Sequence, residues 1–180
     1  MAISTMAPEV KEARAQCGWT QENVASDIHM TRQMVQMVEK GKRRLTEQDT
    51  ARLARRLDDG QFCMSLARRI TGGLSAPYLN GIDNHRLACA MKLVEELQEV
   101  IDIVAVGMPL LIRAQSAADL LPGEKEQIEA MMIETIEAIT AAENTLARLS
   151  KTYDISLADL WDRHEAKLIE KGYLRKEKDR

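Results

Sequence analysis

The sequence predicts an all-α protein, and its composition is the first observation behind that expectation. Aromatic residues make up only 3% of the 180 residues, whereas methionine occurs ten times and alanine and leucine are frequent. Strands favour aromatic and β-branched side chains, while helices favour Ala, Leu, Met, Glu and Lys. With 45% hydrophobic and 29% charged residues, the composition is that of a folded domain and not of a disordered chain.

Turn and capping residues, the second observation, divide the first 72 residues into five short helices. Pro8 opens the first helix, where a missing N–H costs nothing, and Gly18 ends it. Threonines begin the next three, because a side-chain oxygen can accept a hydrogen bond from a free N–H of the first turn. The expected helices are 8–17, 21–28 with Thr20 as cap, 31–39 with Thr31 as cap, 46–57 with Thr46 as cap, and 61–71.

The second half has a longer helical period. A stretch rich in glycine, residues 73–82, predicts a linker. Beyond it we expect a helix over 83–121 with a kink or break at Gly107 and Pro109, one over 124–152 and one over 157–171 with Ser156 as cap. The apolar stripes on the first two are Leu93, Leu97, Val100, Ile101 and Val104, then Ile128, Met132, Ile136, Ile139 and Leu146. The sequence thus predicts a helical hairpin with a third helix over 83–180.

The net charge of −3 hides an asymmetry between the two halves. Residues 1–72 contain 12 Lys and Arg against 9 Asp and Glu, and residues 73–180 contain 13 against 19. A mildly basic first part suits DNA, and an acidic second part suits a protein partner.

The chain shows no signal for a membrane, a metal or a cofactor. The three cysteines, Cys17, Cys63 and Cys89, lack metal-ligand spacing and predict small reduced core residues. The first residues have no secretory pattern, and no apolar run reaches about 18 residues. We therefore expect a cytoplasmic protein that does not contact a membrane.

The helix expected over 31–39 has an outward face suited to reading DNA. Ala25 supplies a small residue where two short helices cross at a tight turn, so the valines of both helices face a core. The face left outward carries Arg32, Gln33, Gln36 and Met37. Arg pairs bidentately with guanine and Gln with adenine in the major groove, so this face fits base recognition.

Residues 9–71 resemble the Xre family of lambda-repressor-like helix-turn-helix proteins. The carrying stretch, GWTQENVASDIHMTRQMVQMVEKGKRRLT, has the family's Gly-hydrophobic-Thr-Gln run, its central alanine, its Ser or Thr after the turn and its Glu-x-Gly-x-Arg. The resemblance implies a five-helix lambda-repressor-like domain. It also implies that Gln21 touches phosphate and braces the recognition helix, and that the domain contacts DNA through Thr31, Lys40, Lys42 and Arg43.

Two positions depart from the family's pattern. His29 stands where glycine is usual, at a turn position that tends to need a positive φ. Trp19 replaces a smaller aliphatic residue, and we expect it to pack in the core and not on DNA.

These observations predict a non-enzymatic transcription regulator of bacterial or phage origin, a repressor that binds operator DNA as a homodimer through residues 83–180. Two alternatives stay open for the second half. One is an antitoxin-like or other protein-binding regulator. A protein or small-molecule effector is a separate candidate partner of the regulator.

The other alternative is enzymatic. Glu95-Glu96-x-x-Glu99 followed by Asp102 resembles the acidic motif of the MazG-like all-α nucleotide pyrophosphatases, in which carboxylates hold Mg²⁺ against a triphosphate. Glu134 and Glu137 are a candidate second set, although that family's Glu-x-x-Asp is missing. Because Glu95, Glu99 and Asp102 lie away from the apolar stripe, we expect them on a solvated outer face.

Overall fold

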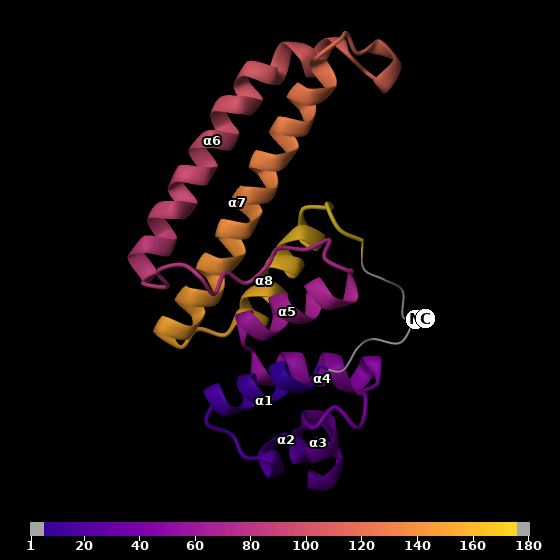
Figure 1. Cartoon of the computed structure of the whole chain (residues 1–180), viewed down its shortest axis with the longest axis vertical. Coiled ribbons are helices and arrows are strands. Elements are labelled where there is room, and N and C mark those ends of the chain that lie inside the picture. The colour runs from indigo at the N-terminus through magenta and orange to yellow at the C-terminus, as the bar shows by residue number, and fades with distance from the viewer. Residues whose placement is uncertain (1–5, 176–180) are drawn as a thin grey trace.

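The computed structural model describes residues 6–175, and in this part of the chain all regular structure is helical. The prediction of an all-α fold is confirmed. Five short helices form one body, and two long antiparallel helices, α6 and α7, extend from it as an arm (Figure 1). The elements are α1 (Ala7–Gln16), α2 (Gln21–Asp27), α3 (Arg32–Glu39), α4 (Glu47–Leu57), α5 (Gly60–Ile70), α6 (Arg86–Arg113), the 3₁₀ turn η1 (Ala117–Asp119), α7 (Glu124–Tyr153) and α8 (Leu157–Glu170).

Capping threonines and a serine begin four of the helices, as predicted. Each of these side chains accepts a hydrogen bond from the backbone N–H three residues further on, at 3.1 to 3.2 Å. The caps are Thr20, Thr31, Thr46 and Ser156. All the predicted helices except α6 begin and end within one residue of the observed bounds.

The helices α1 to α5 share one apolar core. Its fully buried side chains come from every one of the five helices or their caps, so each helix turns one face inward. Ala25 is buried among them on α2, in keeping with a close approach to α3. The largest of these side chains are Phe62, Ile28, Leu53, Val10, Val24 and Val35.

The arm is organised differently. Where α6 and α7 face each other, the buried positions hold mostly small or polar residues, among them Gly107 on α6 and Ala138 on α7. The apolar stripes read from the sequence point largely outward: Ile101 on α6 is 60% exposed and Ile136 on α7 is 58% exposed. The hairpin therefore leaves apolar side chains in solvent that a partner can cover.

The bounds of α6 differ from the prediction. The helix starts at Arg86, with His85 as its cap, and runs through Gly107 and Pro109 to Arg113. The expected break at these two residues is wrong: α6 continues through both to Arg113, although Pro109 has no N–H to donate to the preceding turn. The end of the predicted helix, residues 114–121, forms a loop that contains η1 instead.

The predicted linker is irregular but not a free tether. Asn144 of α7 is buried, and its side chain accepts a hydrogen bond from Leu79 N at 2.8 Å and donates one to Pro77 O at 3.0 Å. A Cβ on Gly60, at the start of α5, would lie 2.5 Å from Ala147 Cβ of α7. Only glycine allows this close approach, which seats the arm on the body formed by α1 to α5.

Two smaller findings concern the cysteines and the membrane. The three cysteines are free thiols, but the expectation that all lie in the core is wrong: Cys89 is buried, Cys17 half-buried and Cys63 exposed. No helix in residues 6–175 combines the length and apolar character that a bilayer-spanning segment needs.

Candidate nucleic-acid interface

The four residues predicted to read bases lie on the exposed face of α3. Arg32, Gln33, Gln36 and Met37 are all exposed, while Val35 and the other valine of the helix are buried beneath them. Within residues 6–175, the side chains of Arg32, Gln33 and Gln36 form no hydrogen bond or ion pair. Their donors and acceptors are therefore free for base edges.

Gln21 fixes the position of α3 through the last residue of that helix. Its Nε2 donates to Glu39 Oε2 at 2.8 Å. Arg14 of α1 donates to the same carboxylate, from Nε to Oε1 at 2.6 Å, and also to Trp19 O at 2.6 Å. This network ties α1, α2 and α3 together, as the bracing role inferred for Gln21 requires.

The carboxylate of Glu39 is the centre of that network. Burial by itself raises its pKa, but the hydrogen bonds from Arg14 and Gln21 and the charge of Arg14 outweigh burial, so the pKa is lowered. The sequence reading did not assign a role to Arg14 or Glu39. A signal for Glu39 was present, because it is the first residue of the Glu-x-Gly-x-Arg pattern.

The turn before α3 has the backbone that the sequence predicted. His29 adopts a φ of 56°, the left-handed conformation that glycine usually supplies. The N–H of Met30 bonds to Ala25 O at 2.8 Å and closes the turn. Histidine is one of the few residues besides glycine that adopt this conformation more often than most, and its side chain is exposed here.

Thr31 and the basic residues frame α3 at its two ends. Thr31 is exposed at the N-terminal cap. Lys40, Lys42 and Arg43 are exposed after the C-terminal end, where Gly41 turns the chain at a φ of 70°. None of these three cations forms an ion pair with a residue in the described part of the chain, so they are available to phosphates.

Trp19 packs against the core of the body, as expected. It is half-buried, and the guanidinium of Arg56 lies over its ring at 4.6 Å from the centroid. Arg56 is held there by an ion pair with Asp27 at 2.7 Å. The ring of Trp19 is therefore already occupied by contacts with the core and with Arg56.

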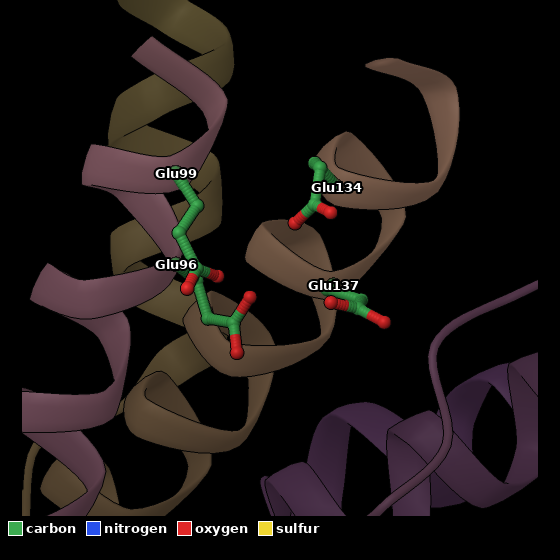
Figure 2. Close-up of side chains that lie close together, drawn as sticks. All are labelled: Glu96, Glu99, Glu134 and Glu137. Carbon is green, nitrogen blue, oxygen red and sulfur yellow. The ribbon is translucent and has the colours of Figure 1, made fainter. Parts of the chain in front are cut away.

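The acidic residues of the arm meet only in part as the sequence suggested. Glu96 and Glu99 of α6 lie opposite Glu134 and Glu137 of α7 (Figure 2). Glu95 and Asp102 are not members of this group; Glu95 pairs with Lys92, and Asp102 accepts from Gln98. Glu99 is exposed to solvent, as expected, but the expectation of an outer face is wrong for it, because it faces α7.

The comparison with protein families agrees with this geometry. Residues 10–58 match the family model described as Helix-turn-helix (HTH_3), which covers a little over a quarter of the chain. The match supports a DNA-binding helix-turn-helix in this segment, which contains α2 and α3. The second half matches no family model. Neither the search of curated proteins nor the search of solved structures found a match.

Proposed function

We propose that this protein is a cytoplasmic transcription repressor of bacterial or phage type that binds its operator as a homodimer. The observation that carries the proposal is the exposed face of Arg32, Gln33 and Gln36 on a helix fixed from behind by Gln21 and Glu39. A rigid helix that presents arginine and glutamine is suited to the major groove. Occlusion of a promoter requires nothing beyond this binding.

The positions of the predicted backbone contacts support the same orientation. Thr31 lies at one end of α3 and the basic residues 40–43 at the other. Phosphate contacts at both ends of a recognition helix fix its register in the groove without reading sequence. Base contacts from the centre of the helix then supply the specificity.

A second copy of the chain is the partner that we propose for the arm. Helix-turn-helix proteins bind two half-sites about one helical turn of DNA apart, so they act as two-fold dimers. A two-fold interface pairs one surface patch with the same patch on the other copy. The exposed apolar side chains of α6 and α7 suit such pairing, because an apolar surface can pack against a second copy of itself. They are Leu87, Met91, Val94, Leu97, Ile101, Met108 and Ile112 on α6, with Met132, Ile136 and Ile139 on α7.

Two measurements test this proposal. Selection of bound fragments from genomic DNA of the native host, at defined salt, should enrich a site with two-fold symmetry. Light scattering after size-exclusion chromatography should give twice the mass of the 20.3 kDa chain. No enriched site contradicts DNA reading. A strict monomer at about tens of micromolar contradicts the dimer. A stoichiometric second protein in a pull-down from the host favours the antitoxin-like alternative instead.

The proposed function involves no catalysis. The MazG-like alternative has one observation in its favour, the meeting of Glu96 and Glu99 with Glu134 and Glu137. Two of the residues that suggested it, Glu95 and Asp102, lie outside that group, as described above. Hydrolysis of a nucleoside triphosphate with Mg²⁺, lost in Glu99→Gln, would overturn the non-enzymatic assignment.

A further inference from the structure

Four glutamates face one another across the seam between α6 and α7, on the arm and apart from the recognition helix (Figure 2). Glu96 and Glu99 are three residues apart on α6, and Glu134 and Glu137 are three apart on α7, so each pair shares one helix face. One carboxylate oxygen from each side chain lies within 4.8 Å of the corresponding oxygen of each of the others. The antiparallel hairpin thus brings four negative charges to one place.

Glu96 is the side chain that marks this place as more than a charged surface. It is 4% exposed, and its Oε2 is buried without a hydrogen-bond partner in the described part of the chain. Its other oxygen accepts from Lys92 at 2.7 Å. A buried carboxylate oxygen without a partner is costly, because it has lost its water and gained nothing in exchange. Figure 2 shows this carboxylate directed toward the other three.

The positive charge near the cluster does not balance it. Lys92 is half-exposed and is shared between Glu96 and Glu95, at 2.7 and 3.3 Å. Burial, together with the charges of Glu96, Glu134 and Glu95, raises the pKa of Glu99. The neighbours therefore already make it harder for Glu99 to hold its charge, as expected where several carboxylates share a site without enough cation.

We propose that Glu96, Glu99, Glu134 and Glu137 bind one hard divalent cation. The donor set is carboxylate oxygen throughout, with no histidine or cysteine, which suits Mg²⁺, Mn²⁺ or Ca²⁺ and not a softer metal. Opposite oxygens lie about 4.1 Å apart around Mg²⁺ and about 4.8 Å apart around Ca²⁺. The four oxygens lie within 4.8 Å of one another, which is the spacing expected of carboxylate ligands that share one such ion.

The cation would join the two helices of the arm. It would give Glu96 Oε2 the partner that it lacks and offset the repulsion between the pair on α6 and the pair on α7. The arm, which carries the proposed dimer surface, would thereby be more stable with metal than without. This inference does not depend on DNA binding, and its test uses no DNA.

Titration calorimetry on the full chain, first stripped with EDTA, measures binding of Mn²⁺, Mg²⁺ and Ca²⁺. We expect one saturable site per chain for at least one of these ions. Glu96→Gln and Glu134→Gln each remove a ligand charge with little change in shape and should weaken binding roughly tenfold or more. Glu126→Gln is the matched control, because Glu126 is exposed on α7 but outside the cluster, and it should bind like wild type.

Thermal unfolding of the same proteins, measured first in EDTA and then with metal, provides a second readout besides affinity. In EDTA, Glu96→Gln should unfold at or above the wild-type temperature, because it relieves repulsion. The tightest-binding ion should raise the wild-type and Glu126→Gln midpoints but not that of Glu96→Gln. Two results would overturn the proposal: no saturable binding of any of the three ions to wild type, or equal affinity and equal thermal shift in wild type and Glu96→Gln.

Discussion

The two halves of the molecule place their apolar side chains in opposite ways. In α1 to α5 they converge on one core, and Leu53 is only 1% exposed. In α6 and α7 the large apolar residues point outward, while the seam between the helices holds glycine, alanine and a buried glutamate. The first half is complete as a single copy, and its polar outer face is free for DNA. The second half leaves large apolar side chains exposed on the outer faces of α6 and α7.

The same difference in packing explains why the sequence predicts the exposed face of α3 but not the outward faces of α6 and α7. A short helix with one inward face has one outward face, so burial of the valines on α3 determines that Arg32, Gln33 and Gln36 are exposed. A long helix with two apolar faces gives no such answer from its sequence. Which face meets its neighbour depends on what else packs there.

Core truncation should separate the halves most strongly. Leu53→Ala should lower the free energy of unfolding by about 2–5 kcal/mol, because it removes a fully buried side chain. Ile101→Ala, on the outward face of α6, should cost less than about 1 kcal/mol at protein concentrations where the chain is monomeric. Urea unfolding monitored by circular dichroism measures both. Equal losses would contradict the difference in packing.

Charge on the outward stripes should separate the copies while leaving each fold intact. Ile101→Glu combined with Ile136→Glu should weaken dimerisation, since each isoleucine contributes about 1.5–3 kcal/mol when buried in an interface. The variant should be monomeric by light scattering and retain the wild-type helical signal. Lys125→Glu, also exposed on the arm, is the control. A dimer that survives the double substitution would place the interface elsewhere.

The bracing network predicts a dependence on pH. The folded pKa of Glu39 lies below its ordinary 4.5, so its contribution to stability is present above pH 4.5 and is lost as the pH falls below that value. Glu39→Gln removes this ionisation. Unfolding measured on both sides of pH 4.5 should show a smaller loss on acidification for the variant than for wild type. An equal loss would mean that Glu39 is not the group responsible.

Replacement of Lys42, one of the basic residues that follow α3, should give the smallest effect. Lys42→Ala should weaken binding to all DNA sequences similarly and reduce the slope of log affinity against log salt by about one. Lys125→Ala, at the far end of the arm, should leave that slope unchanged. A loss restricted to the selected operator would show instead that Lys42 reads bases.

The sequence was sufficient for local features, because these depend on neighbours in the chain. The threonine caps and the exposure of Arg32 follow from residues within one or two turns, and the positive φ at His29 follows from the resemblance, since glycine is usual there. Features that depend on distant residues were missed or misplaced. Arg14 reaches Glu39 across 25 positions, and Asn144 holds the linker across 65. Glu99 is exposed, as expected, but the sequence did not show that it faces Glu134 and Glu137 of α7, which lie 35 or more positions further along the chain.

Binding of the selected operator by an Arg32→Ala, Gln33→Ala double variant tests the central claim most directly. We predict a loss of about 2–6 kcal/mol in specific binding, from two bidentate contacts, while binding to unrelated DNA changes little. Gln127→Ala with Arg163→Ala, two exposed residues of the second half, is the matched control and should bind as wild type does. If the Arg32, Gln33 variant also binds the operator with wild-type affinity, α3 is not the reading helix.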